Sequence, residues 1–365
     1  MILAVAIAAM LIATGGLLIY KDSLTRSGFS QSDLRTPVVV YDSSVKVWNP
    51  VPTTTNEPSK SISMTWVMTP IYAGYGGTVN LTLTNDGPTV IHISGYGLEW
   101  IVSGIKTTRN ENLNLTPGSS ANLGLLFFDA PDTVGSYSYR LLLDLAVKVW
   151  SGTSWHDFGM IEGSTKQADI IPSLSYHNYT TTKNQASYFD KIKGLSGGSE
   201  VSSLANTIKG GQSYNIQLIC DAFDWVVNNI AYKDDPSDYW QSCAETLSWR
   251  TGDCEDQAIL IASIITDMGG NARVNIVEGH AFPTVFVGTN STSVYAIDSA
   301  VESHYGTSLP VYYIHDSMGY WMVIDTTGFP YAGGLPTTAG PVLDGGANAW
   351  SFESTNFLIA IDVMF

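Results

Sequence analysis

The feature that most constrains the fold is a polar helix start that leads into an amphipathic helix in the second half of the chain. Residues 249–256 read Trp-Arg-Thr-Gly-Asp-Cys-Glu-Asp, and apolar residues then recur at helical spacing as far as Met268, before Gly269 and Gly270. Cys254 therefore lies in the first turn of the predicted helix, where unpaired N–H groups and the helix dipole favour a negative charge. A thiol with an ordinary pKa of about 8.5 can be shifted toward thiolate there, and the thiolate is the form that attacks carbonyls.

Two polar residues downstream complete a possible catalytic set. His280 follows Gly279 at the start of a strand-like run, and Asp325 follows Ile324 near the end of another. Cysteine, histidine and aspartate supply a nucleophile, its base and a group that orients the base. Asp298 is the alternative third residue, since it is nearer to His280 in sequence.

The acidic residues beside the cysteine have a simpler interpretation than catalysis. Asp253, Glu255 and Asp256 stabilise a helix N-terminus by capping and by their charge. They raise the pKa of a neighbouring thiol, so His280 has to supply most of the activation. We interpret Asp234, Asp235 and Asp238 as a solvated turn, because their spacing does not fit an EF-hand loop.

The remaining chain divides into segments of different pattern. We predict a Ser/Thr/Pro-rich stalk over 21–59, an all-β Ig-like sandwich over 60–165 and a polar connector with one short helix over 166–212. Residues 213–336 alternate helical and strand-like runs, which predicts an α+β domain with a helix on an antiparallel sheet. Residues 337–365 form a tail that ends in a predicted strand.

The N-terminus predicts a membrane segment. Residues 1–20 are apolar and uncharged, which is long enough for one transmembrane helix. A signal peptide is the alternative, but it normally begins with basic residues. Lys21 and Arg26 favour a cytoplasmic body under the positive-inside rule, whereas four glycosylation sequons favour an exported one. We expect a single-pass membrane protein with its body outside the cell.

Charge and cysteine count narrow the partners. The formal net charge is −16, from 33 acidic and 17 basic residues, without a basic cluster, so nucleic acid is not an expected partner. The three cysteines suggest a Cys220–Cys243 bridge with Cys254 free, unless Cys220 is simply a buried small hydrophobe. No zinc-ligand spacing or cofactor motif is present, so we predict no metal and no cofactor.

The motif residues resemble the transglutaminase-like superfamily, and most closely its microbial and archaeal branch of cysteine peptidases. The similarity covers about a third of the chain and is carried by Glu245-Thr246-Leu247, Arg250, Gly252-Asp253-Cys254-Glu255-Asp256, Ala258, Gly279-His280-Ala281-Phe282, Tyr320-Trp321 and Ile324-Asp325-Thr326-Thr327. It implies a papain-like core with Cys254 as nucleophile, His280 as base and Asp325, by its aromatic-apolar-Asp-Thr pattern, as the third residue. It also implies an oxyanion hole from the Cys254 N–H and an upstream Gln or Trp, for which Trp240 is the candidate.

These observations predict a surface thiol enzyme that acts on peptide or side-chain amides through a thioester on Cys254, with a protein or peptide as substrate. Hydrolysis is favoured over crosslinking, with residues 289–319 as an insertion over the site. The alternative is a surface adhesion or binding protein whose transglutaminase-like domain has lost catalysis.

Overall fold

The computed structural model describes most of the chain from residue 43 onward. The predicted membrane segment 1–20 lies outside the described residues, as does the predicted stalk 21–59 except for residues 43–48. Among the helices that are described, none combines the length and apolarity needed to cross a membrane. The described residues are 43–48, 62–148, 154–173, 177–178, 180–183, 185–235, 237, 239–289, 291–344, 347–352 and 357–363.

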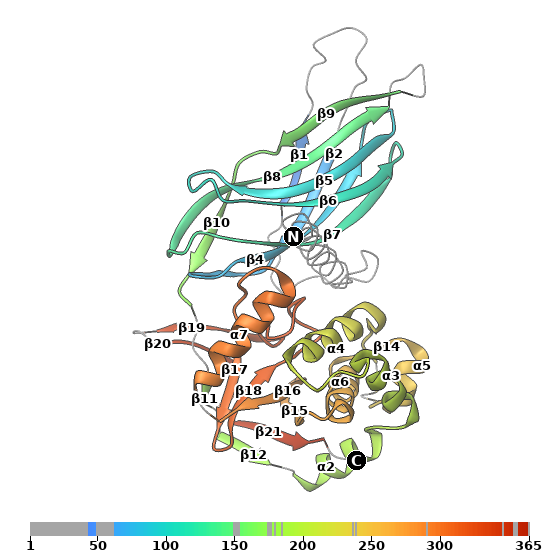
Figure 1. Ribbon diagram of the computed structural model, residues 1–365, viewed down its shortest axis with the longest axis vertical. Coiled ribbons are helices and arrows are strands. Elements are labelled where there is room, and N and C mark those ends of the chain that lie inside the picture. The colour runs from blue at the N-terminus through green and yellow to red at the C-terminus, as the bar shows by residue number, and fades with distance from the viewer. Residues whose placement is uncertain are drawn as a thin grey trace, which may run out of the picture.

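The N-terminal part of the described chain is strand-rich. Its strands are β1 (Ser43–Trp48), β2 (Ile62–Met68), β3 (Ile71–Tyr72), β4 (Gly77–Asn85), β5 (Ile91–Trp100), β6 (Lys106–Leu115), β7 (Ser120–Phe128), β8 (Gly135–Lys148), β9 (Trp155–Glu162) and β10 (Lys166–Ile171). One sheet has the order β1-β2-β4-β7, and the other has the order β3-β10-β8-β5-β6 with β9 beside β8. The two sheets pack face to face as a sandwich (Figure 1).

Side chains from both sheets fill one apolar core. Along β2 the more buried positions alternate with less buried ones, as expected for a strand with one face on a core. Trp100 lies fully buried between the sheets, where its ring contacts Phe128 and Tyr139. Its indole N–H donates to the carbonyl oxygen of Asp129 at 2.9 Å, so the polar end of this large side chain is also satisfied.

The C-terminal part combines helices with a second sheet. Its helices are α2 (Ala186–Leu195), α3 (Ser199–Lys209), α4 (Ile216–Asn229), α5 (Cys243–Trp249), α6 (Cys254–Met268) and α7 (Ser291–Tyr305). Its strands are β11 (His177–Asn178), β12 (Thr180–Lys183), β13 (Ala231–Tyr232), β14 (Thr251–Gly252), β15 (Ala272–Val277), β16 (His280–Gly288), β17 (Tyr313–Asp316), β18 (Gly319–Val323), β19 (Ala339–Asp344), β20 (Ala347–Phe352) and β21 (Phe357–Asp362).

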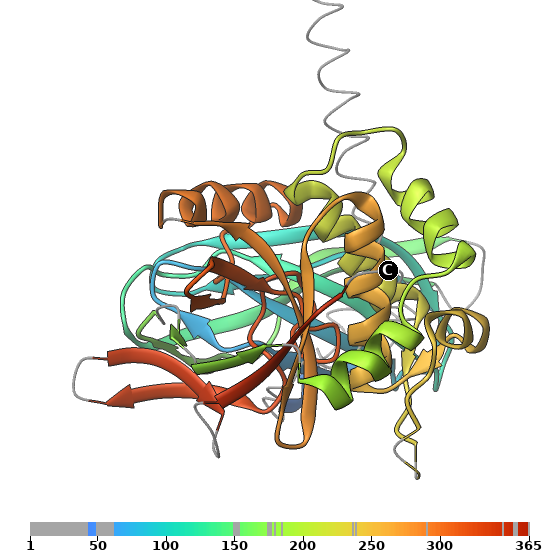
Figure 2. The ribbon, with the colours of Figure 1, turned by 90° about the horizontal axis from the view of Figure 1, so that it is seen from below.

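The main sheet of this part has the order β11-β17-β18-β16-β15-β21-β12. Its inner pairings are antiparallel, whereas β11 and β12 pair parallel to their neighbours at the two edges. Helix α6 packs against β15 and β16 (Figures 1 and 2). This arrangement agrees with the predicted mixed α/β chain, in which a strand-rich part precedes a helix-on-sheet core.

Three segments differ from the predicted boundaries. β1 lies inside the predicted stalk and pairs with β2. The predicted connector holds two helices rather than one, and it also supplies β10 to the sandwich and β11 and β12 to the sheet edges. Within the predicted tail, β21 forms the expected final strand but takes an inner place between β15 and β12.

The expected Cys220–Cys243 bridge is not formed, because both cysteines are free. Cys220 is fully buried in the apolar core, and the Cys243 thiol donates to Ser263 Oγ at 3.4 Å. Burial raises the pKa of the Cys220 thiol far above its usual range and that of Cys243 to about 11. Both residues are therefore buried, unreactive side chains, which is the alternative that the sequence left open for Cys220.

The sandwich and the C-terminal part share an apolar contact. Within β3, Ile71 packs in the sandwich core, whereas Tyr72 packs in the core of the C-terminal part, edge-on to Tyr312 at 6.0 Å. Nearby, the Gly76 N–H donates to the carbonyl oxygen of Ser308 at 2.7 Å. A Cβ at Gly76 would lie 2.2 Å from the Phe128 carbonyl oxygen, so only glycine fits this close approach.

Candidate active site

The loop before α6 is shaped by its glycine and its acidic residues. A Cβ at Gly252 would lie 2.7 Å from Asp256 Cβ, so glycine permits the chain to turn closely over the first helical turn. Asp253 is the N-cap residue, and its N–H donates to Asp256 Oδ2 at 3.3 Å. The helix therefore begins at Cys254, as the sequence predicts.

The Cys254 thiol is half-buried at this helix start. It donates to Glu255 Oε2 at 3.1 Å, and its sulfur accepts a hydrogen bond from the Ala281 N–H at the start of β16. Burial raises the pKa of the thiol, and the charges of Glu255 and Asp253 raise it further, while the Ala281 N–H opposes them. The protonated thiol is thus the resting form in the absence of other charges.

His280 is the first residue of β16 and directly precedes Ala281, whose N–H reaches the sulfur. Gly279 before it has a φ of +72°, a turn conformation that favours glycine. The buried imidazole stacks on Phe282 at 5.9 Å, and its Nε2 lies 2.8 Å from Asp325 Oδ2. With Nε2 bonded to the carboxylate, Nδ1 is the ring nitrogen that can exchange a proton with another group.

Asp325 follows β18 and is held from several sides. Its Oδ1 accepts from the Thr327 N–H at 3.0 Å and from Thr327 Oγ1 at 2.8 Å, and its Oδ2 also accepts from the Thr337 N–H at 2.8 Å. Burial by itself raises the pKa of this carboxyl, but His280 and the two N–H groups outweigh it, so the pKa lies below its usual value. Asp325 is therefore an ionised, fixed partner for the imidazole.

The two candidate aspartates have different hydrogen-bond partners. Asp298 lies on α7, where it accepts from Tyr313 Oη at 2.6 Å, and burial raises its pKa. The carboxylate that is bonded to His280 is that of Asp325. The run Tyr295-Ala296-Ile297 before Asp298 is helical, whereas Asp325 lies two residues after β18, which ends at Val323.

Trp240, the predicted oxyanion donor, has its ring packed against two residues of the connector helix α2. Its ring stacks on Tyr188 at 6.0 Å, and Lys191 Nζ lies 3.8 Å above it. The next residue, Gln241, is buried, and its N–H donates to Asp256 Oδ1 at 2.7 Å, which ties this loop to α6. Within the described residues Gln241 Oε1 has no hydrogen-bond partner. The sequence predicted Trp240 as the oxyanion donor and did not single out Gln241, the residue that follows it.

Gln257, which the sequence did not single out, connects the loop before Cys254 with the segment that carries Asp325. Gln257, fully buried on α6, donates through Nε2 to the Gly252 carbonyl oxygen at 2.8 Å. Its Oε1 accepts from Thr326 Oγ1 at 2.9 Å, next to Asp325. The cysteine loop and the aspartate segment are therefore held in fixed relation by one side chain. Its only sequence signal is a polar residue on the buried side of an amphipathic helix.

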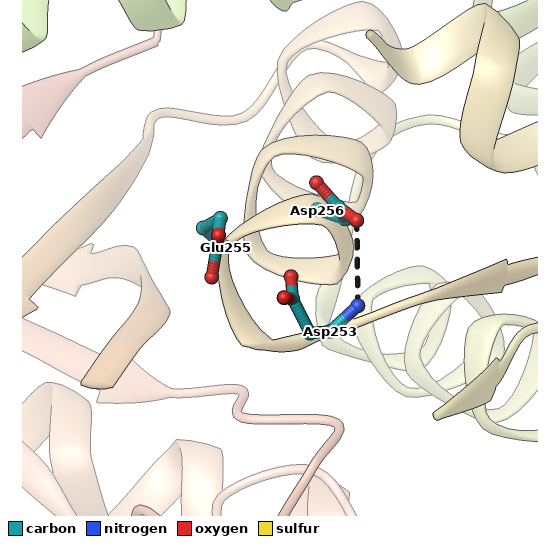
Figure 3. Close-up of side chains that lie close together, drawn as sticks. All are labelled: Asp253, Glu255 and Asp256. Atoms are coloured by element: carbon teal, nitrogen blue, oxygen red, sulfur yellow. Dashed lines mark hydrogen bonds between the residues drawn. The ribbon is translucent and has the colours of Figure 1, made fainter. Parts of the chain in front are cut away.

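Three carboxylates gather around the first turn of α6 (Figure 3), and one of them, that of Glu255, accepts from the Cys254 thiol. One oxygen from each of Asp253, Glu255 and Asp256 lies within 4.8 Å of the others, in the spacing of a cation site. Burial, followed by the neighbouring carboxylates, raises the pKa of Asp253 to about 8, and burial raises that of Asp256 to about 6. From the sequence we interpreted these residues as helix caps. Their joint burial depends on the fold and could not be predicted from the sequence.

The other acidic group behaves as a turn. Asp234 accepts from Tyr232 Oη at 2.6 Å, and Asp235 accepts from the N–H groups of Ser237 and Tyr239 at 2.9 and 3.0 Å. These bonds are internal to the loop, in keeping with the predicted turn. Asp238 lies outside the described residues.

Solved structures with similar chains are distant. A Parabacteroides distasonis protein provisionally described as a protease is 10% identical, with a TM-score of 0.24, over 61% of this chain and 62% of that one. A Cytophaga hutchinsonii protein provisionally described as a cysteine protease is 12% identical, with a TM-score of 0.25, over 73% and 75%. The PapD-like domain 7 of human CEP192 is 13% identical, with a TM-score of 0.20, over 35% of this chain and 98% of the domain. The chain thus spans less than two thirds of the Parabacteroides protein.

Sequence comparison is more specific than these weak structural similarities. No curated protein sequence matches the chain. The family model of the transglutaminase-like superfamily matches residues 202–325, a range that contains Cys254, His280 and Asp325 and ends at that aspartate. Residues 202–325 of this chain therefore belong to the transglutaminase-like superfamily.

Proposed function

We propose that the chain is a thiol enzyme that transfers acyl groups from peptide or side-chain amides through a thioester on Cys254. The observation that carries this proposal is the buried hydrogen bond between His280 and Asp325, at the strand start whose Ala281 N–H contacts the Cys254 sulfur. A nucleophile on α6, a base on β16 and an orienting carboxylate just after β18 match the roles of a catalytic triad.

The proposed reaction has two half-steps. His280 Nδ1 takes the Cys254 proton, the sulfur attacks the amide carbonyl carbon, and the proton passes to the leaving amine as the C–N bond breaks. Water, deprotonated by the same imidazole, then attacks the thioester and releases a carboxylic acid and the free thiol. Asp325 keeps Nε2 protonated and stabilises the imidazolium throughout. An amine in place of water would form a new amide instead.

We propose hydrolysis as the main outcome, with a peptide or protein as substrate and with the sandwich as an Ig-like module that presents the enzyme at the cell surface. Anchoring by residues 1–20 is proposed from their apolar sequence and from the sequons, which favour export.

A non-catalytic binding domain is the second candidate, and one observation favours it. The thiol donates to Glu255, and burial and neighbouring carboxylates raise its pKa, which disfavours the nucleophilic thiolate. A binding domain does not need a nucleophilic thiolate, so a raised thiol pKa would not impair it.

Site-resolved alkylation of the full chain, purified in detergent, distinguishes the two candidates. We expect iodoacetamide at pH 7 to label Cys254 in the wild type, and His280→Ala to slow labelling by about tenfold or more because the imidazole no longer takes the proton. The matched control is His304→Ala, since His304 is also a buried histidine bonded to a carboxylate, Asp224, at 2.7 Å. Cys220 and Cys243 stay unlabelled while the chain is folded.

Equal labelling rates in the wild type, His280→Ala and His304→Ala would exclude the enzyme and leave the binding domain. If the rates differ as expected, casein as a general substrate separates the two reactions. New amino termini or released ammonia indicate hydrolysis, whereas incorporation of a fluorescent primary amine indicates crosslinking. Cys254→Ala has to abolish both.

A further inference from the structure

Two aromatic side chains close to the start of α6 in sequence are exposed to solvent. Trp249 is the last residue of α5, Tyr239 lies in the loop before that helix, and they are 54% and 48% exposed. Their rings lie side by side, with centroids 6.4 Å apart and planes at 30°. Exposed aromatic side chains that lie together mark surfaces that bind a partner. We propose that this aromatic pair binds an arginine-containing segment of the peptide substrate, an inference that rests on the proposed function.

The aromatic pair is held in place before a ligand binds. The Tyr239 N–H donates to both carboxylate oxygens of Asp235, at 3.0 and 2.9 Å, and the Tyr239 hydroxyl donates to Glu245 Oε1 on α5 at 2.9 Å. Glu245 also accepts from the Ser242 N–H at 2.8 Å, as part of the capping box of α5. A ligand that contacts Tyr239 therefore does not have to order this ring first, which reduces the entropy lost on binding.

The charge around the aromatic pair favours a cationic ligand. Residues 231–256 include seven acidic and two basic residues. Hydrogen bonds from the Ser242 N–H and hydroxyl, followed by the bond from Tyr239, lower the pKa of Glu245, so this carboxylate stays ionised beside the pair. One of the two basic residues, Arg250, lies over the Trp225 ring, 5.2 Å from its centroid. The guanidinium group of a ligand arginine stacks on aromatic faces and pairs with carboxylates, so it matches both features of this surface.

The aromatic pair is near enough to Cys254 for one extended peptide to contact both. Trp249 precedes Cys254 by five residues, which span no more than about 18 Å even when fully extended. Strand β14 lies between them in the chain, and Gly252 of β14 pairs with Tyr232 of β13, a third exposed ring. Helix α5 and β14 both contact α6 (Figure 1). An arginine about five residues or fewer from the reacting amide can therefore reach the aromatic pair.

Binding of fluorescein-labelled peptides to the full chain in detergent, followed by fluorescence anisotropy, tests the proposal. The probe is a short Gly/Ser peptide with two arginines, and its control carries citrulline, an uncharged analogue of arginine, at both positions. We expect saturable binding of the arginine peptide that weakens as salt rises, and at least about tenfold weaker binding of the citrulline peptide. His280→Ala should bind the arginine peptide like the wild type, so a failure of the proposed catalysis is detected separately.

Variants test whether the aromatic pair is the surface that binds. Trp249→Ala and Tyr239→Ala should each weaken binding of the arginine peptide about threefold to tenfold, because each removes a ring face from the guanidinium. Glu245→Gln should weaken it as well, since glutamine keeps the capping box but removes the charge. The matched control is Trp155→Ala, because Trp155 is also an exposed tryptophan, at 41%, but lies on β9 of the sandwich. It should leave the affinity unchanged.

Protection of Cys254 tests whether the bound peptide reaches the nucleophile. Saturating arginine peptide should slow iodoacetamide labelling of Cys254 in the wild type, and Trp249→Ala should need more peptide for the same effect. Binding without protection, or equal binding of the arginine and citrulline peptides, would overturn the proposal. Unchanged affinity in Trp249→Ala and Tyr239→Ala, with Cys220 and Cys243 still protected, would also overturn it. A chitin oligosaccharide that binds where the arginine peptide does not would assign the aromatic pair to a glycan instead.

Discussion

Asp325 accepts four hydrogen bonds, and this number explains how an acid that is 3% exposed stays ionised. Removal from water disfavours a carboxylate, but each N–H or O–H donor and the imidazole favour the charged form. At Asp253 the environment instead favours the protonated form, because its Oδ1 has no hydrogen-bond donor and its neighbours are carboxylates. The same residue type is thus held at opposite protonation tendencies within one site.

This difference predicts the acid dependence of stability. The pKa of Asp325 is lowered in the folded state, so its contribution is present above the unfolded pKa of about 4 and is lost as pH falls through the folded value. We expect Asp325→Asn to be less stable than the wild type at pH 7, with the difference shrinking as the pH falls below about 4. Urea unfolding of both proteins over that range measures it.

Asp298→Asn provides the control of opposite sign. Burial raises the Asp298 pKa, so its ionisation weakens the fold as pH rises above about 4. The stability of Asp298→Asn relative to the wild type should therefore increase from pH 4 upward. Parallel profiles for the two variants would contradict the assignment of Asp325 as the stabilised carboxylate.

At the scale of elements, one arginine joins four strands of the C-terminal sheet. Arg273 on β15 is 2% exposed and forms ion pairs of 2.8 Å with Asp316 at the end of β17 and with Asp362 at the end of β21. Its guanidinium lies 3.4 Å above the ring of Trp321 on β18. These contacts fix the register of strands that are far apart in sequence.

Arg273→Ala should therefore lower the stability of the fold. Removing the cation leaves Asp316, 5% exposed at its side chain, as a buried charge without its ion partner, and we expect a loss of about 3–5 kcal/mol in unfolding free energy. Arg140→Ala is the matched control, because Arg140 also pairs with two carboxylates, Glu99 and Glu162, but at the surface of the sandwich. There the expected loss is below about 1 kcal/mol. Similar losses in chemical unfolding would refute the difference in burial as the cause.

Elements with strong local signals could be predicted, and elements made by distant pairing could not. The start of α6 at Cys254 and its end at Gly269 follow from capping residues that are adjacent in sequence. β12 is Thr-Thr-Thr-Lys, a polar stretch whose only reason to be a strand is its parallel pairing with β21. The carboxylates near Cys254 fall in the same class, since they are buried in the folded chain and the Gln241 N–H that bonds to Asp256 comes from another loop.

At the scale of the whole molecule, the cores of the two parts are joined through neighbouring residues. Ile71 and Tyr72 alternate sides of β3, and each is almost fully buried in a different core. Phe127 at the end of β7 also packs on Tyr305 of α7 at 5.2 Å. The sandwich is thus a structural support for α7 and the segment after it. Sequence periodicity predicted both parts but not this contact, because the alternation of a two-residue strand carries no detectable signal.

Tyr72→Ala tests whether this contact stabilises the C-terminal part. The cavity should cost about 3 kcal/mol and, in mild urea, raise the rate of Cys243 alkylation on the order of 100-fold, because the buried thiol reacts only when the C-terminal part opens. Tyr96→Ala makes a similar cavity in the sandwich core alone, so it should leave Cys243 protected. Equal acceleration by both changes would mean that the two parts unfold as one cooperative unit, and no acceleration by Tyr72→Ala would mean that the C-terminal part stands without the sandwich.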